Sequence, residues 1–583
     1  MNKLIRKIKD GTLTQVIKEL KWIIQLGKKY VWAIVWYVLL GMLGIGVTLC
    51  SSVISKNIID IVTGQQEGLI MFAAVTYIAM QLAKIVLNAI TGNVSARVQL
   101  KVNQQIRADI FGKIMHACWE PVMKFHSGDL LARSGRDADT VASSVLGWAP
   151  TFAVSFVQFV GTFVLILYYD ATLALIALAS APITLLTSGF LMKKMRKHNQ
   201  KMRIIGSELM SFHSESFNNV QAIKSFGVVD AYCKKLNEIQ IKQKDVTLEY
   251  NKFSILTSSF LGTVAVIVTA ITYFFCVFRL WKGHITYGEM TMFLHLAGVL
   301  SSAFSSLVGL VPTTITAATA AGRVMALTEL PAENSEPLDE VEETLKSGSR
   351  AIHLKAENIE FSYIEGNTVL KQADMETEPG QIVALVGESG CGKTTMLRIL
   401  LGIVEVQKGK VSIRDEKNNT VMPVSPSTRR LFSYVPQGNT LFSGTIAENL
   451  RIMKPDATDS ELEEVLSAAC ALNFVKELPQ GMYTHIGERG NGLSEGQVQR
   501  ISIARALLSN APILLFDEAT SALDVKTEKQ LLRNISKFRG ERTCIVTTHR
   551  PSVLVACDRV YKISDESLKL LNENEIKEFI MES

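Results

Sequence analysis

The stretch "IVALVGESGCGKTT", residues 382–395, decides how the second half of this 583-residue chain folds. Its first five residues form an apolar, β-branched run, a glycine-rich loop follows, and the residues after the loop favour a helix. This is the phosphate-loop pattern, in which backbone N–H groups turn inward onto phosphate oxygens. Lys393 can then reach the β- and γ-phosphates of a nucleotide, and the Thr394 hydroxyl can bind magnesium. The stretch therefore predicts an α/β domain with a nucleotide site at the end of a buried strand.

A second motif, "APILLFDEATSALD" at residues 511–524, supplies two acids after four apolar residues. The apolar residues predict a buried strand that ends at Asp517 and Glu518. Asp517 can hold magnesium through water, and Glu518 can orient and deprotonate an attacking water molecule. The alternative is an ordinary acidic junction between a strand and a loop. We favour the catalytic interpretation because the phosphate loop supplies the nucleotide that these acids need.

The first half of the chain differs from the second, because it contains long stretches without charge. Six of these stretches have the roughly 20 mostly apolar residues that cross a membrane. They lie near 30–54, 68–90, 143–169, 172–193, 255–280 and 288–312. The alternative, six buried helices of a soluble protein, would require flanks that also bury polar surface. The sequence thus predicts a membrane domain followed by a soluble domain.

The distribution of Lys and Arg predicts the orientation of the spans. Segments 91–140 and 194–250 and the N-terminal arm are rich in both residues, which places them in the cytoplasm. Both termini are then cytoplasmic. The N-terminal arm also contains an amphipathic stretch, "LTQVIKELKWIIQLGKK" at 13–29, which we expect to lie along the inner membrane surface before the first span.

Four polar residues within the predicted spans are candidates for a transport path: Gln81, Lys84, Gln158 and His295. Each also has a simpler interpretation. Lys84 can snorkel towards the membrane surface, and a glutamine or histidine can hydrogen-bond to a neighbouring helix.

Composition excludes several classes of protein. The net charge of +6 comes from cations that cluster at the N-terminus and beside the apolar stretches, which indicates membrane orientation and no nucleic-acid partner. The eight cysteines show no spacing typical of a metal site, so we expect free thiols. The basic N-terminus lacks the short apolar core and the small-residue cleavage site of a signal peptide.

The combined motifs resemble those of the ATP-binding cassette (ABC) transporters, of the exporter type. The phosphate loop, "LSEGQ" (493–497), "ILLFDEATSALD" and the strand-end histidine of "CIVTTHRPS" follow the family's order over nearly all of 351–583. The stretches "SGDLLARSGRDADTV" and "SESFNNVQAIKSFGVVD" resemble the family's long cytoplasmic loops, and "TAAGRV" its exit from the sixth span. The resemblance implies an all-α six-helix transmembrane domain (1–328), an acidic linker (329–350) and an α/β P-loop ATPase domain (351–583).

The resemblance also assigns roles to individual residues. It implies that Tyr363 stacks on adenine, that Gln437 contacts magnesium and the attacking water, and that His549 contacts the γ-phosphate. Ser521 and Asp524 would belong to a loop that crosses to a partner subunit. The implied catalytic residues are Glu518, His549 and Gln437, and the magnesium ligands are Thr394, Gln437 and Asp517. The implied ATP-binding residues are Tyr363, Gly387, Glu388, Ser389, Gly390, Cys391, Gly392, Lys393, Thr394, Thr395, Ser494, Glu495, Gly496, Gln497, Ser521 and Asp524.

In this family each ATP lies between the phosphate loop of one chain and the "LSGGQ"-type signature of the other. One chain here would be half of a transporter in the plasma (bacterial cytoplasmic) membrane, in contact with membrane lipid. It would pair with a second copy of itself or with a related half-transporter. Short helices near 118–127 and 211–218 would transmit the motion that ATP drives. ATP hydrolysis with Mg²⁺ would then export an amphipathic small molecule, lipid or peptide.

Other functions fit parts of the sequence. An importer built on the exporter fold, one half of a heterodimer, and an ATP-gated channel or regulator share these motifs. Channels and regulators are expected to have a damaged hydrolytic site, whereas Glu518 and His549 are both present. The six spans argue against soluble DNA-repair ATPases with similar cassettes. The cargo itself is not encoded in any motif.

Two residues depart from the family pattern. His485 stands where many exporters carry an acid, in a loop that contacts the helices transmitting motion. Glu495 places a negative charge within "LSEGQ". We expect Ser494 to cap a helix with Gln497 in a capping box, and the Glu495 carboxylate to point outward into water. Glu495 would then be a tolerated modulator of an active site.

Overall fold

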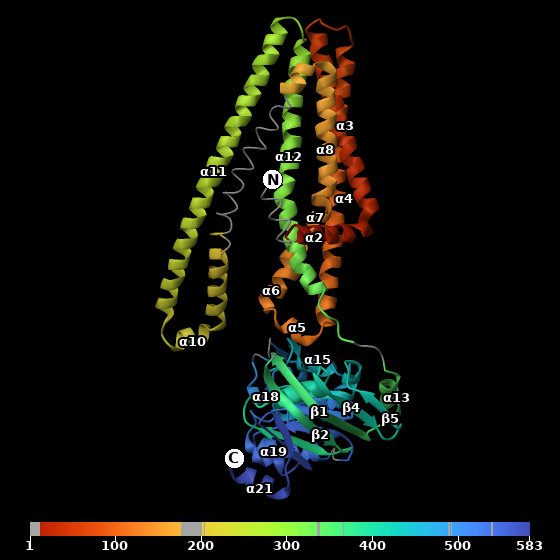
Figure 1. Ribbon diagram of the computed structural model, residues 1–583, viewed down its shortest axis with the longest axis vertical. Helices are drawn as coiled ribbons and strands as arrows, with labels where there is room; N and C mark the ends of the chain where they lie inside the picture. Colours follow the sequence, from red (N-terminus) through yellow and green to blue (C-terminus); the bar gives the residue numbers. More distant parts are fainter. Residues whose placement is uncertain are drawn as a thin grey trace. The chain divides into compact units, whose positions relative to one another are not determined.

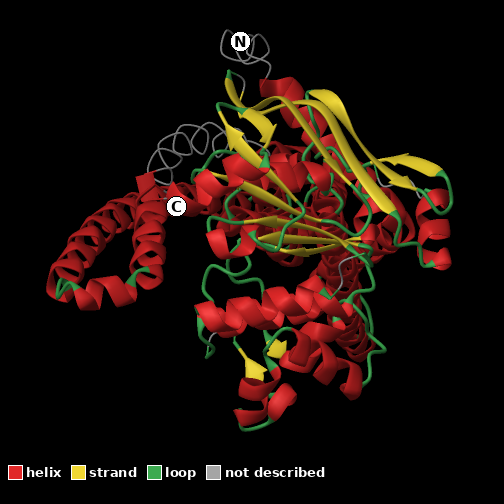
Figure 2. Cartoon of the chain, turned by 90° about the horizontal axis from the view of Figure 1, so that it is seen from below, coloured by secondary structure: helices red, strands yellow, loops and turns green. Residues whose placement is uncertain are grey.

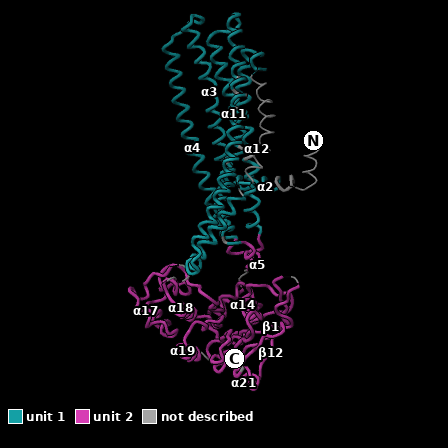
Figure 3. Tube along the Cα trace, turned by 90° about the vertical axis from the view of Figure 1, so that its left-hand side faces the viewer, with its two compact units in different colours: residues 1–113, 126–329 teal, residues 114–125, 330–583 magenta. Residues whose placement is uncertain are grey.

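The computed structural model describes residues 12–176, 201–202, 204–334, 338–364, 366–487, 490, 492–537 and 540–582. The chain forms two compact units (Figure 3). Unit 1 comprises 1–113 and 126–329, and unit 2 comprises 114–125 and 330–583. The short segment 114–125 therefore packs with the C-terminal unit although it lies within the first third of the sequence. The domain boundaries expected from the sequence remain predictions.

Unit 1 is helical (Figure 1). Its described elements are α2 (Thr12–Gly27), η1 (Lys28–Tyr30), α3 (Val31–Val62), α4 (Ile70–Met115), α6 (Ser127–Ala132), the π-turn η2 (Arg133–Asp137), α7 (Ala138–Gly147), α8 (Ala149–Tyr169), α10 (Val220–Ser225), α11 (Val229–Trp281) and α12 (Tyr287–Thr328). α4 continues two residues into unit 2.

Among the described residues, four helical stretches are long and apolar enough to cross a membrane. They are Ile17–Val62, Ile70–Met115, Gly128–Tyr169 and Tyr287–Thr328. The predicted span at 172–193 lies almost wholly outside the described residues. The predicted span at 255–280 falls within α11, where the described apolar stretch is the shorter Thr269–Trp281. Unit 1 is thus a helical membrane domain, and the count of six spans stays a prediction.

Glycines set the closest approaches between the helices of unit 1. A Cβ at Gly41 of α3 would lie 2.8 Å from Val154 Cγ2 of α8. A Cβ at Gly322 of α12 would lie 2.3 Å from Glu19 Oε1 of α2, a carboxylate that is 8% exposed. A side chain at Gly41 would displace Val154, and one at Gly322 would displace the Glu19 carboxylate, so the two glycines allow α3 to pack closely on α8 and α12 on α2.

The short helix expected near 211–218 lies further along the chain. Residues 204–218 belong to one continuous helix, and a turn at Asn219 separates it from α10. The predicted position of the short helix, 211–218, is wrong because these residues contain no Gly or Pro that would interrupt the longer helix. The short helix α10 ends before Gly227, which has φ +66°.

Unit 2 contains two large sheets and one small one, drawn yellow in Figure 2. The four-stranded antiparallel sheet has the order β2 (Asn367–Thr377), β1 (Ile352–Ile364), β4 (Lys408–Asp415), β5 (Thr420–Pro423). The six-stranded sheet has the order β12 (Ser567–Leu570), β11 (Arg559–Ser564), β3 (Ile382–Gly387), β10 (Thr543–Thr547), β9 (Ile513–Asp517), β6 (Phe432–Val435). β7 (Gly444–Thr445) pairs with β8 (His485–Ile486).

All strands of the six-stranded sheet run parallel except β12. β3, β9 and β10 are buried along their whole length, which explains why they read as continuous apolar runs. The carboxyl ends of these three neighbours, at Gly387, Asp517 and Thr547, meet at one edge of the sheet. This edge carries the candidate site.

The helices of unit 2 are short. They are α5 (Trp119–Met123), α13 (Asp339–Ser347), α14 (Lys393–Leu400), α15 (Ile446–Arg451), α16 (Asp459–Ala468), α17 (Leu472–Glu477), α18 (Glu495–Leu508), α19 (Val525–Ser536), α20 (Pro551–Leu554) and α21 (Glu573–Glu582), with 3-10 turns at Ser427–Leu431 and Gly481–Tyr483. The apolar faces of α15 to α20 build one core with β9 and β10. A second core lies between the two large sheets and includes α13 and α14.

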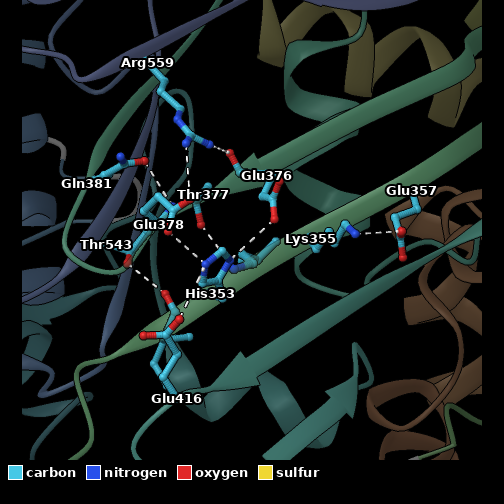
Figure 4. Close-up of polar contacts among 12 residues, drawn as sticks. His353, Lys355, Glu357, Glu376, Thr377, Glu378, Gln381, Glu416, Thr543 and Arg559 are labelled. Carbon is cyan, nitrogen blue, oxygen red and sulfur yellow. Dashed lines mark hydrogen bonds and ion pairs between the residues drawn. The ribbon is translucent and has the colours of Figure 1, made fainter.

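A polar cluster joins β1 to its neighbours in the four-stranded sheet (Figure 4). His353 Nε2 lies 3.0 Å from Glu378 Oε2 and 3.8 Å from Glu416 Oε1, and Nδ1 lies 3.9 Å from Glu376 Oε1. Arg559 Nη2 also contacts Glu378 Oε1 at 3.2 Å. The cluster ties β11 of the parallel sheet to the loop after β2.

Backbone and side-chain contacts hold the 114–125 segment within unit 2. The amide of Cys118 donates to Pro331 O at 2.8 Å, and the amide of Glu333 donates to His116 O at 2.8 Å. Arg429 forms two hydrogen bonds with the Glu333 carboxylate, at 2.6 and 2.9 Å. Trp119, the first residue of α5, packs against the core between the large sheets. The helix that the sequence places near 118–127 therefore forms as α5.

Candidate functional site

The phosphate loop joins β3 to α14, and its glycines have backbone conformations that other residues rarely adopt. Gly387, Gly390 and Gly392 have φ values of +151°, +84° and +110°. A Cβ at Gly387 would also lie 2.6 Å from Ile563 O, so a side chain there would clash with β11. Glu388, Ser389 and Gly390 are exposed, and Gly392 is the N-cap of α14. The loop thus presents exposed backbone at the start of a helix, which is where anions bind.

Lys393 links this loop to a second strand end. Its side chain is 5% exposed, and Nζ donates to Gly387 O and Glu388 O, both at 2.9 Å. Nζ also lies 2.8 Å from Nε2 of His549, which follows β10. The predicted γ-phosphate contact His549 is therefore adjacent to the predicted phosphate-binding lysine.

Asp517 ends β9 and is 1% exposed, and three hydroxyl groups surround its carboxylate. Thr394 Oγ1 donates to Oδ1 at 3.2 Å, Thr547 Oγ1 donates to Oδ1 at 2.7 Å, and the Tyr434 hydroxyl donates to Oδ2 at 3.2 Å. Burial and the nearby Asp517 charge raise the pKa of Tyr434, so this phenol stays protonated and remains a donor. These bonds compensate for the burial of the carboxylate.

The neighbouring Glu518 completes a chain of contacts across the sheet edge. Its Oε1 lies 3.2 Å from His549 Nε2, and its Oε2 accepts a hydrogen bond of 2.7 Å from Gln437 Nε2. Glu518 has φ +49°, in the left-handed region, and its amide donates to Thr547 Oγ1 at 2.9 Å. Four side chains thus form a continuous row of contacts, each within hydrogen-bond or ion-pair distance of the next: Lys393, His549, Glu518 and Gln437.

Tyr363 lies at the rim of the site. It is 40% exposed, its ring packs edge-on against Phe361, and its hydroxyl lies 3.3 Å from Thr395 Oγ1. Arg398 Nη1 donates to the same hydroxyl at 3.0 Å, and the Arg398 guanidinium lies 4.8 Å from the ring centre of Trp119. The predicted adenine-stacking residue is therefore held by α14 and, through Arg398, connected to α5.

The "LSEGQ" stretch starts α18 as the sequence predicts. The Ser494 amide donates to Gln497 Oε1 at 2.8 Å, and the Gln497 amide donates to Ser494 Oγ at 3.3 Å, which completes a capping box. Ser494 and Glu495 are exposed. A Cβ at Gly496 would lie 2.8 Å from Ala522 O, so the glycine allows the loop after β9 to approach.

α18, the helix that begins with "LSEGQ", contacts the loop after β9. Gln499, 5% exposed, donates to Ser521 Oγ at 3.0 Å and accepts from the Ala522 amide at 3.1 Å. Asp524 caps α19 by accepting from the Lys526 and Thr527 amides, and the bonds from Thr527 lower its pKa. Within the described part of unit 2, the side chains of Ser494 and Gln497 hydrogen-bond to each other's backbone amides.

Four residues of the site were not predicted from the sequence: Thr547, Tyr434, Arg398 and Gln499. Thr547 stands two residues before the predicted His549, at the end of a strand that neighbours β9, so the parallel order would have indicated it. Tyr434 and Gln499 lie within three residues of the predicted Gln437 and Gln497. The sequence contains no signal for Arg398, since its contacts depend on α5.

Two family descriptions match this chain. The ABC transporter transmembrane region matches residues 34–304, and the ABC transporter cassette matches residues 370–521, so together they account for most of the chain. The chain belongs to the ABC transporter family. It is therefore a membrane protein and a transport-coupled ATPase that binds ATP.

Similar proteins cover nearly the whole transporter. A multidrug resistance ABC transporter ATP-binding and permease protein of Lactococcus lactis subsp. lactis is 27% identical over 541 residues, 90% of this chain and 88% of the relative. An ATP-dependent lipid A-core flippase of Blochmanniella pennsylvanica is 28% identical over 467 residues, 80% and 79% of the two chains. A fatty acid ABC transporter ATP-binding/permease protein of Mycobacterium bovis is 27% identical over 466 residues, 79% and 72%.

A solved structure shares the fold of the transporter. The structure of a bacterial Atm1-family ABC exporter with ATP bound superposes with a TM-score of 0.80, at 21% sequence identity, and covers 94% of this chain and 98% of that chain. The transporter therefore has the exporter-type fold, a helical transmembrane domain followed by an ABC ATPase domain.

The membrane unit of the transporter contains a cavity of 650 Å³ between α3, α4, α8 and α12. Three of the four polar residues predicted for a transport path line it: Lys84, Gln158 and His295. Gln81 is not among the lining residues. Placing a lysine at the centre of a membrane-spanning helix costs about 3 kcal/mol of insertion free energy. A lysine that lines a cavity within a span is therefore a candidate functional residue.

His485, the first departure from the family pattern, is exposed on β8 and pairs with Thr445 of β7. The following residues Glu488 and Arg489 lie outside the described part of the chain. The contact expected between this loop and the helices that transmit motion stays a prediction.

Proposed function

We propose that this transporter exports an amphipathic small molecule, lipid or peptide across the plasma membrane, driven by ATP hydrolysis. The proposal rests on the row of side-chain contacts Lys393–His549–Glu518–Gln437, which lies beside the buried Asp517. Every side-chain type needed for ATP hydrolysis is present at one sheet edge, in a chain that also has a membrane unit. The similarity to the multidrug, lipid A-core and fatty acid transporters favours amphipathic cargo.

The residues fit the roles that the sequence indicates. Lys393 and the exposed amides of the loop would bind the phosphates, and Tyr363 would stack on adenine. Glu518 would accept a proton from the attacking water, while Gln437 orients this water and His549 holds the γ-phosphate. Because Gln437 already donates to the Glu518 carboxylate, the two side chains are placed to share one water molecule.

The donor set at Asp517 fits Mg²⁺. A carboxylate and the Thr394 hydroxyl supply oxygen ligands, and Mg²⁺ prefers oxygen ligands and retains several waters. Bound magnesium would neutralise phosphate charge. The chain's own contribution is to hold the Asp517 carboxylate in place through Thr547 and Tyr434.

We propose that two chains form the working unit, each with a composite ATP site. Ser494 and Glu495 at the start of α18 are exposed, so this helix start is accessible to the phosphates bound by a second copy. ATP would close this dimer by binding the closed form better than the open form. Pairing with a related half-transporter is the alternative partner. Both termini would be cytoplasmic.

An ATP-gated channel or a regulator is a second candidate function, and an importer on the exporter fold is a third. The intact Glu518–His549 pair favours turnover over gating alone. The direction of transport follows only from the exporter-type fold and the names of the relatives.

Proteoliposomes that contain the purified full chain test the proposal. We expect magnesium-dependent ATPase activity and ATP-dependent uptake of an amphipathic dye into inverted vesicles. Glu518→Gln should retain ATP binding and lower ATP hydrolysis by about 10²-fold or more, because a general base contributes that much. Wild-type ATPase activity without dye uptake, or a Glu518→Gln variant with undiminished hydrolysis, would contradict the proposal.

A further inference from the structure

Among its described lining residues, the cavity between α3, α4, α8 and α12 contains one cation and no acid. The cation is Lys84 of α4. The neutral polar lining includes Asn88, Gln158 and Thr48, and His295 lies opposite on α12. Among the described residues, no carboxylate lies within ion-pair distance of Lys84 Nζ, although other lysines of this unit have such partners, such as Lys56 with Asp60 at 3.2 Å. The cavity therefore has an uncompensated positive charge.

Lys84 lies within the predicted span 68–90, between its centre and its second end. It follows Ile70, the first residue of α4, by 14 positions, which corresponds to roughly 21 Å along the helix axis. The hydrocarbon core of a membrane is about 30 Å thick. A lysine at this depth either reaches towards the surface or faces a polar cavity, and here it lines the cavity.

A contact with α3 holds the His295 ring in place. Ser52 Oγ, which also lies 2.9 Å from Thr48 O, is 3.1 Å from His295 Nδ1. His295 therefore lines the cavity as a fixed polar side chain, and Lys84 supplies the charge.

Glycines provide the space for a ligand. A Cβ at Gly44 or at Gly298 would meet no atom within 4 Å, and both glycines line the cavity. The volume of 650 Å³ is within the range of small-molecule sites. A larger residue at Gly298 would project into open space rather than into a helix.

We propose that this cavity binds the anionic group of an amphipathic cargo, with Lys84 as the charged contact. The inference rests on the proposed export function and specifies its substrate class. A carboxylate or a phosphate satisfies the same chemistry, since either would supply the negative charge that the cavity lacks. The apolar part of the cargo would lie against the apolar lining of the same cavity, such as Leu40, Val154 and Val299.

Binding of tritiated oleate to the full chain in phosphatidylcholine nanodiscs tests this proposal. Competition with oleyl alcohol and oleylamine, which have the same tail, isolates the charge. We expect oleate to bind about tenfold more tightly than either competitor, because hydrogen bonds to charged groups are among the strongest. Equal affinities for the three ligands would overturn the proposal.

Variants locate the contact. Lys84→Gln should weaken oleate binding about tenfold and leave oleyl alcohol unaffected, and Lys84→Arg should retain oleate binding. Lys101→Gln, an exposed lysine of α4 outside the cavity, is the matched control and should not change binding or ATPase activity. Gly298→Leu should weaken both oleate and oleyl alcohol. If Lys84→Gln instead dissociates a dimer and leaves oleate binding unchanged, Lys84 pairs with the partner subunit and the proposal fails.

Two further arms separate the remaining explanations. Displacement of oleate by millimolar acetate or inorganic phosphate identifies a soluble anion as a sufficient ligand and supports the charged contact. It also argues against a requirement for a lipid tail. Oleate binding that depends on Lys84, without ATP-dependent uptake, supports this inference while refuting the export function. ATP-dependent uptake of oleylamine that Lys84→Gln does not change would support the export function and refute the role of Lys84 in binding an anion.

Discussion

Thr547 is the strongest point at which to perturb the nucleotide site without touching a group that would contact ATP. Its side chain is 1% exposed, donates to Asp517 Oδ1 at 2.7 Å and accepts from the Glu518 amide at 2.9 Å. Thr547→Val replaces the hydroxyl by a methyl group of similar size. The variant therefore removes two hydrogen bonds and creates no cavity.

The expected magnitude follows from these two bonds. A hydrogen bond to a charged group contributes about 1.5–3 kcal/mol, so the free energy of unfolding of unit 2 should fall by about that amount. The Glu518 amide retains the Thr547 carbonyl at 3.3 Å as a poorer acceptor, which allows the Glu518 side chain to shift. A displacement of about 1 Å from the productive geometry lowers turnover by about 10²-fold.

Thr543 of the same strand is the matched control. It is fully buried, accepts from the Gly380 amide at 3.0 Å and donates to Ile352 O at 3.2 Å, at the end of β10 away from the site. Thr543→Val should lower stability by about 1–2 kcal/mol, because its partners are neutral, and leave turnover per folded molecule unchanged.

The assay combines thermal unfolding with ATPase rates at saturating ATP and magnesium, normalised to the folded fraction. We expect Thr547→Val to lose turnover, Thr547→Ser to retain most of it, and Thr543→Val to lose stability alone. If the two valine variants have equal turnover, or if Thr547→Ser is as inactive as Thr547→Val, Thr547 does not position Glu518.

Three other predictions concern unit 2. Trp119→Ala should raise the KM for ATP severalfold with little change in kcat, since it removes a cation–π contact of about 1 kcal/mol from Arg398; a loss of kcat alone in ATPase titrations would contradict this. Bonds from Lys454 hold the pKa of Glu461 at about 2, below its usual 4.5. The ionised Glu461 carboxylate therefore stabilises the folded state fully above pH 4.5, and this contribution is lost as the pH falls through about 2. Glu461→Gln should therefore lower the unfolding temperature at pH 7 and have a smaller effect at pH 3, as measured by thermal unfolding. Glu495→Gly should change the KM for ATP by no more than about threefold, because an exposed carboxylate is screened by water; a tenfold gain in affinity would show that it opposes the phosphates.

Local patterns made part of the site predictable. The phosphate loop and the capping box of Ser494 depend on residues a few positions apart, so their glycine and hydrogen-bonding requirements are written directly into the sequence. The contact between Thr547 and Asp517 is different. It requires β10 to lie next to β9 in the parallel order, and the residues between the strands do not specify that order.

Contacts between distant helices were also beyond local reasoning. Hydropathy marked Lys84, Gln158 and His295 as unusual within apolar stretches, but it could not show that three helices bring them to one cavity. The position of α10 at Val220–Ser225 was missed for a related reason, because the turn at Asn219 has no glycine or proline to mark it.

The left-handed conformation of Glu518 lowers the stability of the folded protein at a residue that its ATPase activity requires. A non-glycine residue in this region stores about 1–2 kcal/mol, which glycine or asparagine would release. Laboratory selection for heat resistance alone should therefore favour Glu518→Gly or Glu518→Asn and yield hardier, inactive proteins. Engineering of a more thermostable transporter should therefore keep Glu518 and introduce stabilising substitutions at other positions.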